Sequence, residues 1–288
     1  MRAHRLTHAG VCLGLFGVIL LTPGTASAGV KVDAGGIFTC AVKLDRTAIC
    51  WGSDSAGQTS PPGGKFRNVS AGNAGACGVR PNGKVRCWGS DVFGQLSPPD
   101  GKFRLVSAGG NHNCGVKRND KVACWGQDTD GETVPPGARF RSVSAGLDHT
   151  CGVKRNDKVA CWGKDGSGQA SPLGGNFSSV SAGENHTCGV KQSGKVRCWG
   201  SNSSDQSDPP GALFRSVSAS SVHTCGVRED GKLRCWGFDG QNRASPPAKK
   251  FRSLSAGTTH NCGVRRDGKV RCFGSNSQGQ SDVPPSLS

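Results

Sequence analysis

The chain has 288 residues, a formal net charge of +16 and no tyrosine. From residue 29 onward, Leu, Ile, Val and Phe together make up only about 17% of 260 residues, a content typical of disordered chains, while 14 cysteines point to a cross-linked one. This composition excludes a membrane protein and an ordinary apolar globule, and leaves either disorder or a repetitive, disulfide-braced fold.

Residues 1–28 have the pattern of a secretory signal peptide. Arginines stand near the start, an apolar run covers residues 11–21, and Ala26-Ser27-Ala28 is a small-residue cleavage site. The run is too short to span a membrane comfortably. We therefore expect a secreted (extracellular) protein, cut near Ala28, with no transmembrane segment in the mature chain.

Cysteines divide the rest of the chain into seven units of 37 residues. Each unit holds two cysteines ten residues apart, and units start near residues 29, 66, 103, 140, 177, 214 and 251. Seven such units fill residues 29–288, which we expect to form a single domain. The pairs are Cys40 and Cys50, Cys77 and Cys87, Cys114 and Cys124, Cys151 and Cys161, Cys188 and Cys198, Cys225 and Cys235, and Cys262 and Cys272.

One unit shows the expected elements in order. The segments Phe140–Ala145, His149–Lys154 and Lys158–Trp162 read as strands, with a turn after each of the first two and the polar loop Gly163–Gln169 after the third. Three or four short strands in a unit of this length suit one blade of a β-propeller. The Trp of each unit is expected in the blade core.

The second unit gives the register of the cysteines. A three-residue hairpin turn at residues 81–83 pairs Arg80 with Lys84 and Cys77 with Cys87. Directly opposed residues of this kind lie within disulfide range. One disulfide per hairpin contributes about 2–3 kcal/mol. Seven Cys/His metal sites are the alternative, because a His often lies two residues before the first Cys, but secretion and full pairing favour disulfides.

The recurring Ser-Ala-Gly-x-x-His-Thr-Cys-Gly-Val and Gly-Lys-Val-Arg-Cys-Trp-Gly-Ser-Asn-x-x-x-Gln segments resemble the regulator-of-chromosome-condensation repeat family over all seven units. The resemblance implies an all-β, seven-bladed propeller. The signal peptide and the Trp-Gly … Gly-Gln-Thr-x-x-Pro pattern are similar to secreted bacterial propellers that inhibit β-lactamase. Those inhibitors grip their target with aromatic residues of the Ala-Gly loops, where this chain has only Phe38.

Strand alternation sorts the connections to two ends of the blades. The Ala-Gly loops and the Trp-Gly loops share one end, the loop face. The hairpin turns and strand entries share the other, the hairpin face. Ten acidic residues, Glu132 and Asp205 among them, against Lys164 and Arg243 give the loop face a charge near −8, and the remainder carries about +22. The candidate binding residues of the loop face are Phe38, Asp54, Asp91, Phe93, Asp128, Asp130, Asp148, Asp165, Glu184 and Asp239.

The hairpin face repeats a pair of like charges at the mouth of six hairpins. Opposed like charges destabilise a hairpin slightly, so their persistence favours a ring that binds polyanions. The alternative is that duplication copied a soluble surface whose turn acids, such as Asp120 and Asp157, compensate. The candidate residues are Arg80, Lys84, Lys117, Lys121, Lys154, Lys158, Lys191, Lys195, Arg228, Lys232, Arg265 and Lys269.

Other recurring polar residues are expected to be structural. His112, His149, His186, His223 and His260 repeat at one strand position, whereas catalysis needs different residues converging on one point. The Asx residues of the Trp-Gly loops suit turn stabilisation, with ligand contact as the alternative. The segment 128–131 resembles a calcium loop but lacks its downstream acidic ligand. We expect no metal, no cofactor and no catalytic residue.

These observations predict a secreted, non-enzymatic recognition protein. The loop face would contact a protein partner, and the hairpin face an anionic cell-surface polymer. A lectin-like multivalent glycan binder and an inhibitor of a secreted or periplasmic enzyme are the alternatives. A nucleic acid partner is not expected, because base-stacking aromatics are not evident on the cationic face, and the protein is expected to be a monomer.

Overall fold

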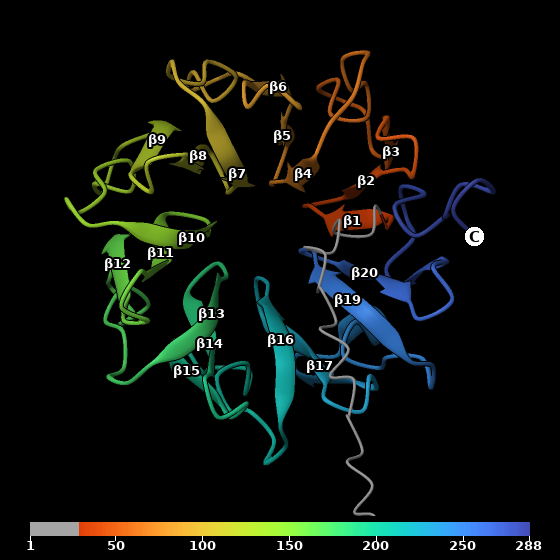
Figure 1. Cartoon of the computed structure of the whole chain (residues 1–288). Coiled ribbons are helices and arrows are strands. Elements are labelled where there is room, and N and C mark those ends of the chain that lie inside the picture. The colour runs from red at the N-terminus through yellow and green to blue at the C-terminus, as the bar shows by residue number, and fades with distance from the viewer. Residues whose placement is uncertain (1–28) are drawn as a thin grey trace, which may run out of the picture.

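The computed structural model describes residues 29–288, and the predicted signal peptide lies outside these residues. Seven antiparallel sheets of three strands each follow one another around a ring (Figure 1). Each sheet comes from three consecutive strands, so that β1–β3 form blade 1 and β19–β21 form blade 7. The predicted all-β, seven-bladed propeller is confirmed.

The innermost strand of each blade lines the centre of the ring. These strands are β1 (Lys31–Ala34), β4 (Asn68–Ala71), β7 (Phe103–Ala108), β10 (Phe140–Ala145), β13 (Phe177–Ala182), β16 (Phe214–Ala219) and β19 (Phe251–Ala256). The middle strands are β2 (Phe38–Val42), β5 (Gly75–Val79), β8 (His112–Lys117), β11 (His149–Lys154), β14 (His186–Lys191), β17 (His223–Arg228) and β20 (His260–Arg265).

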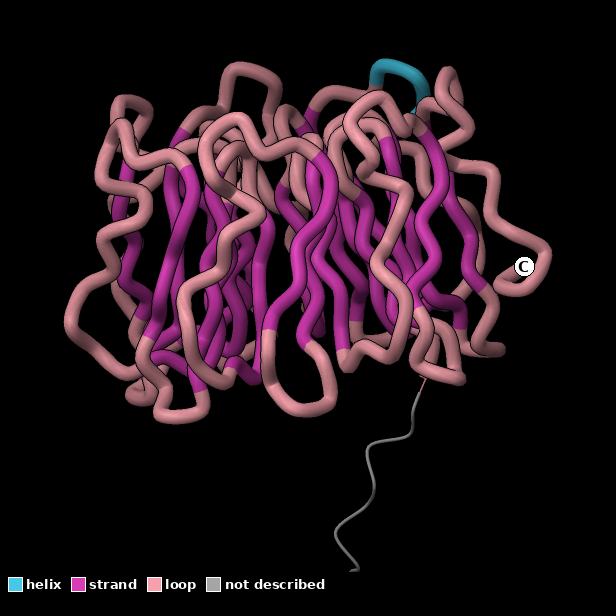
Figure 2. The backbone as a smooth tube through the Cα atoms, turned by 90° about the horizontal axis from the view of Figure 1, so that it is seen from above, coloured by secondary structure: helices cyan, strands magenta, loops and turns pink. Residues whose placement is uncertain are grey.

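The outer strands complete the blades. They are β3 (Ala48–Gly52), β6 (Val85–Gly89), β9 (Val122–Gly126), β12 (Val159–Gly163), β15 (Val196–Gly200), β18 (Leu233–Gly237) and β21 (Val270–Gly274). In the unit described above, the third strand starts and ends one residue later than predicted. The one helical turn described, η1 (Gly240–Asn242), lies in the Trp-Gly loop of blade 6, and Figure 2 shows the loops gathered at the two ends of the strands.

The hairpin register places every cysteine pair as expected. Cys151 lies opposite Cys161 in the β11–β12 ladder, with a Cα–Cα distance of 4.0 Å. The turn between them closes with a hydrogen bond from the Lys154 N–H to the Lys158 carbonyl, and Asp157 takes the left-handed conformation that ends a three-residue hairpin loop. All seven predicted disulfides form in this way.

The disulfides belong to the apolar core between blades. The Cys151–Cys161 bridge of blade 4 shares a cluster with Phe177 and Trp199 of blade 5. The Phe177 ring in turn covers Gly189 of its own blade, where a β-carbon would come within 2.6 Å of the ring. Cystines therefore supply apolar contacts that large aliphatic side chains supply in other folds, which explains how a chain this poor in such residues folds.

The ring closes between blades 7 and 1 without a shared strand, because each end keeps its own three-stranded sheet. Side-chain contacts close the seam instead, together with a main-chain hydrogen bond from the Thr258 N–H to the Gly35 carbonyl at 3.1 Å. His260 bonds to the Thr39 hydroxyl at 2.6 Å, and the Ala34 N–H donates to the Ser255 hydroxyl at 3.1 Å. Leu287 packs into the apolar cluster that joins the two blades.

No helix within residues 29–288 has the length and apolar character needed to cross a membrane.

Candidate functional site

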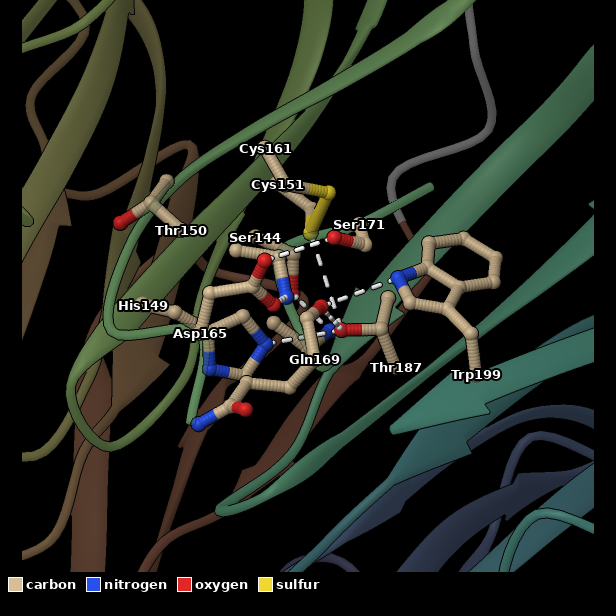
Figure 3. Close-up of a disulfide and its surroundings, with 12 residues drawn as sticks. Ser144, His149, Thr150, Cys151, Cys161, Asp165, Gln169, Ser171, Thr187 and Trp199 are labelled. Carbon is tan, nitrogen blue, oxygen red and sulfur yellow. Dashed lines mark hydrogen bonds between the residues drawn. A yellow bond between two sulfur atoms is a disulfide. The ribbon is translucent and has the colours of Figure 1, made fainter. Parts of the chain in front are cut away.

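The recurring histidines join neighbouring blades by hydrogen bonds, and Figure 3 shows one of them, His149. The Nε2 atom of His149 lies 2.8 Å from the Thr187 hydroxyl, which itself donates to the Gln169 carbonyl at 3.0 Å. Because the single hydroxyl proton goes to Gln169, His149 must donate from Nε2. Trp199 donates to the same Gln169 carbonyl at 2.9 Å. The predicted structural role of this histidine is confirmed, and the structure shows that it is a hydrogen-bond donor between blades.

Burial keeps these histidines neutral. The ring of His149 is fully buried, and desolvation lowers its pKa to about 4, with a smaller contribution from neighbouring His112. The pKa of His186 is lowered to about 3, and those of His223 and His260 to about 4, again mainly by burial. A buried, neutral side chain with no solvent access cannot act as a general base on an external substrate.

The aspartates of the Trp-Gly loops hold their own turns. Asp165 accepts from the Ala170 N–H at 2.7 Å and from the Ser171 hydroxyl at 2.6 Å, while its side chain stays exposed. Asn202 accepts an equivalent N–H bond at 2.9 Å. The turn-stabilising role is confirmed, and the carboxylates still present negative charge to solvent.

The loop face differs from the sequence-based expectation at two residues. Phe38 is fully buried and its ring lies over Gly35, so it is not available to a partner, and the prediction that it belongs to the binding surface is wrong. Glu132 is also buried, because it takes the place that Gln169 has in the next blade and accepts N–H bonds from Thr129 and Asp130.

The remaining loop-face candidates are at least partly accessible. Asp148 pairs with Lys164 at 3.2 Å. Glu184 lies at the wall of a central cavity of about 380 Å³ formed by the Ala-Gly loops of all seven blades. Phe93 is 47% exposed. The exposed acids are Asp54, Asp91, Asp128, Asp130, Asp165 and Asp239.

An exposed aromatic residue of the loop face was missed. Phe238 is 50% exposed and stacks with Arg243, whose guanidinium carbon lies 5.3 Å from the ring centre. The sequence contained a signal for this residue, because the neighbouring units have a serine, Ser201 or Ser275, at the equivalent loop position.

On the hairpin face, the two members of each like-charge pair separate. In three pairs the first member packs over the phenylalanine at the start of its own blade, as Arg80 does at 4.2 Å from the Phe66 ring centre and Lys117 at 5.6 Å from that of Phe103. In two other pairs the first member forms an ion pair with an acid of its own hairpin turn. The second member, as at Lys84, is exposed. The predicted register of the pairs is confirmed, and the stacking relieves part of the repulsion expected from it.

Turn acids neutralise several cations, as the compensation hypothesis requires. Asp120 pairs with Arg155 at 2.7 Å and with Arg104 at 3.0 Å, and hydrogen bonds from Arg155 hold the pKa of Asp120 below its usual value. Asp230 pairs with Arg228 at 3.7 Å. Cations of the hairpin face therefore differ, because some are paired with carboxylates and others are not.

Among residues 29–288, no group of three or more His, Cys, Asp or Glu side chains is placed to hold a metal ion. The fold and its faces define a disulfide-braced, seven-bladed propeller that presents two loop-built surfaces.

The chain belongs to the regulator of chromosome condensation (RCC1) repeat family. The family model matches residues 66–95, 103–132, 140–169, 177–206, 214–243 and 251–280, which correspond to blades 2 to 7. No curated protein sequence matches the chain significantly.

Solved structures agree with this assignment. The ectodomain of the receptor kinase CR4 from Physcomitrella patens is 30% identical, with a TM-score of 0.73, covering 86% of this chain and 73% of that one. The CRINKLY WD40 ectodomain of the Arabidopsis thaliana receptor kinase ACR4 is 26% identical, with a TM-score of 0.73, covering 85% and 97%. Prp20p of Saccharomyces cerevisiae shares the fold at 17% identity, with a TM-score of 0.54, covering 88% and 74%. The similarity to propellers that inhibit β-lactamase stays a prediction.

Proposed function

We propose that this chain is a secreted, non-enzymatic binding protein that uses the two ends of its propeller differently. The loop face contacts a protein partner, and the hairpin face contacts an anionic surface or polymer. The observation that carries the proposal is the separation of exposed charge: carboxylates of the Trp-Gly loops lie at one end of the strands, and the lysines of the hairpin mouths lie at the other.

Two further observations support a binding role. The most similar structures described above are ectodomains of receptor kinases, which agrees with an extracellular chain carrying seven disulfides. In addition, the recurring histidines are buried and neutral, so they are occupied in holding blades together.

The loop face can be tested without disturbing its turns. Asn202 and Asn276 already make the loop hydrogen bond that aspartates make in the other blades. The combined variant D54N/D91N/D128N/D165N/D239N therefore removes five charges and keeps the acceptor of the loop N–H bond. We expect this variant to lose a partner that wild-type protein captures from the native secretome.

A hairpin-face variant is the matched control. Changing the exposed lysines Lys84, Lys121, Lys158, Lys195 and Lys269 to glutamine also alters five charges and should leave that capture intact. Equal loss in both variants, or in neither, would contradict the assignment of the partner to the loop face. Binding of one glycan that the two substitutions D91N/D165N abolish would instead identify a lectin.

The hairpin face is tested on an immobilised polyanion. Wild-type protein is expected to be retained at low salt and released as the salt concentration rises, since each contact releases counterions. Retention that is absent at low salt, or that does not respond to salt, refutes the polyanion-binding role.

A further inference from the structure

Five cations meet on the hairpin face at the seam between blades 6 and 7. They come from the blade 6 hairpin, from the entry into blade 7 and from blade 7 itself. Lys232 forms an isolated β-bridge with Lys250, and the Arg266 N–H donates to the Lys250 carbonyl at 3.0 Å. All five side chains are exposed. The residues of this seam cluster are Lys232, Lys249, Lys250, Arg252 and Arg266.

Main-chain carbonyls hold the two guanidinium groups at the seam. The Arg266 side chain donates to the Asp230 carbonyl at 3.2 Å, and the Arg252 side chain donates to the Arg266 carbonyl at 2.5 Å. Each guanidinium has five N–H donors. Each therefore keeps donors for an external anion while its position is fixed.

The seam cluster contains no ion-paired side chain, although the pKa of the nearby Asp230 is lowered by its backbone hydrogen bond from Lys232, by the charge of Arg228 and then by the charges of Lys232 and Lys250. None of its five residues forms an ion pair with a carboxylate within residues 29–288. Asp230, beside Lys232 in the hairpin turn, pairs with Arg228 instead. Five positive charges thus lie close together at this seam. The seam between blades 2 and 3 has four cations at the equivalent positions, and one of these, Arg104, pairs with Asp120.

Other seams differ at the equivalent positions. The seam between blades 4 and 5 has one cation, with the residues Lys158, Gly175, Asn176, Ser178 and Gln192. The seam between blades 3 and 4 has four, in the set Lys121, Ala138, Arg139, Arg141 and Arg155. Two of those four are neutralised, because Arg141 pairs with Asp157 at 3.0 Å and Arg155 with Asp120. Copying of one repeat therefore does not explain the seam cluster.

We propose that the seam cluster is the anchor site for a flexible anionic polymer with closely spaced phosphate or sulfate groups. The proposal rests on the polyanion-binding role given above and narrows that role to one seam. A guanidinium group can donate two parallel hydrogen bonds to two oxygens of one phosphate or sulfate group, and the flexible lysine side chains add further positive charge. A polymer fits better than a single anion, because the cations come from three segments and call for several charges in succession.

The test replaces four cations with residues that the chain itself has at equivalent positions. The cluster variant is K249A/K250N/R252S/R266Q, which copies Ala212, Asn176, Ser178 and Gln192. The control variant is K102N/R118Q/K121T/R139N, which copies Asn176, Gln192 and Thr47, and it removes the same charge from the seams between blades 2, 3 and 4. The control residues are exposed and form no ion pair in the described chain.

Binding of long-chain inorganic polyphosphate, with heparin as a sulfated second probe, is measured against salt concentration. We expect the cluster variant to bind at least about tenfold more weakly, with a salt slope lower by about 3, and the control variant to change both far less. Inorganic phosphate at millimolar concentration should compete poorly, since one anion cannot span the cluster.

Equal weakening in both variants would show that only net charge matters, and unchanged binding in the cluster variant would place the polymer elsewhere. Either outcome refutes the proposed seam site but not the polyanion-binding role of the hairpin face. If the wild-type protein binds neither probe, both proposals are refuted. Full competition by inorganic phosphate overturns the polymer as ligand. Should the cluster variant fold poorly, K249A/K250N removes two exposed charges that form no side-chain hydrogen bond in residues 29–288, and about half the loss in slope is expected.

Discussion

Blades 3 to 7 and blades 1 to 2 solve the same packing problem with different chemistry. Each blade from 3 to 7 carries a buried histidine that bonds to a polar side chain of the next blade. In blades 1 and 2, Phe38 and Gly75 stand instead, and Phe38 packs in an apolar cluster with Ala76. The polar links are His112–Thr150, His149–Thr187, His186–Thr224, His223–Asn261 and His260–Thr39.

The comparison teaches that the blade interface does not need a hydrogen bond at this position. Phe38 fills the position with an apolar ring in blade 1, whereas Gly75 leaves it without a side chain in blade 2. Phe38 lies over Gly35 as His149 lies over Gly146. The histidine adds a group that can take up a proton. The interfaces formed by the histidines of blades 3 to 7 should therefore lose stability in acid, whereas those formed by Phe38 and Gly75 should not.

The largest effect is expected on stability at acid pH. In the unfolded chain the histidines protonate near pH 6.5, whereas the pKa of His149 in the folded chain is about 4. The unfolded state therefore binds more protons between these values, and stability falls as pH drops from 6.5 to 4. Each such histidine accounts for about 3 kcal/mol. Urea unfolding at intervals across this range measures the loss.

The control exchanges one link for the apolar version. In H149F, which copies Phe38, unfolding should take up about one proton fewer at pH 5 than in the wild type. A stability that is flat between pH 6.5 and 4 would show that the histidines are not protected from protonation.

A second test breaks one link and then repairs it. Thr187→Ala removes the acceptor of the His149 Nε2–H and leaves a buried donor unsatisfied, at a cost of about 1–3 kcal/mol. The double variant H149F/T187A recreates the Phe38 and Ala76 pairing of blades 1 and 2. We expect it to be more stable than the sum of the single effects implies. Strict additivity in a double-mutant cycle would argue that the two side chains are not coupled.

The smallest effect is expected at Asp33, the acidic residue of the inner ring. Asp33 accepts from the Ala71 N–H at 2.9 Å, a bond that Ser70 makes to Ala108 at 3.0 Å in the next blade. Burial raises the pKa of Asp33, so the wild type loses stability as pH rises from 3.8 through that raised value. Asp33→Ser should therefore gain stability relative to the wild type as pH rises, which urea unfolding at several pH values measures. Parallel pH profiles for the two proteins would contradict this.

Much of the fold was predictable because its signals are local. The hairpin turn sets the register, and the register places Cys77 opposite Cys87 without reference to any other blade. The third strand of blade 4 ends one residue later than predicted, because the ladder continues to pair His149 with Gly163. Closure of the ring was not predictable, since it depends on His260 and Thr39, which lie 221 residues apart.

The site was predictable only in outline. The sequence shows that Phe38 and Phe93 both belong to loop-face segments, but only the packing of neighbouring blades shows that the first is buried. It likewise shows a like-charge pair at Arg80 and Lys84, but not that Arg80 stacks on Phe66. Which charges remain uncompensated depends on contacts between units, and a repeat pattern contains no information on those.

Every disulfide joins cysteines ten residues apart within a single hairpin. A growing chain can therefore complete each bridge as soon as one hairpin has emerged, before any later cysteine is present to compete for it. The correct partner of each cysteine in the repeats is therefore always the nearest one in sequence. The seven repeats hold 14 cysteines, and the short loops allow each native pair to meet before later cysteines are synthesised. Short loops therefore reduce the chance of non-native disulfides during folding.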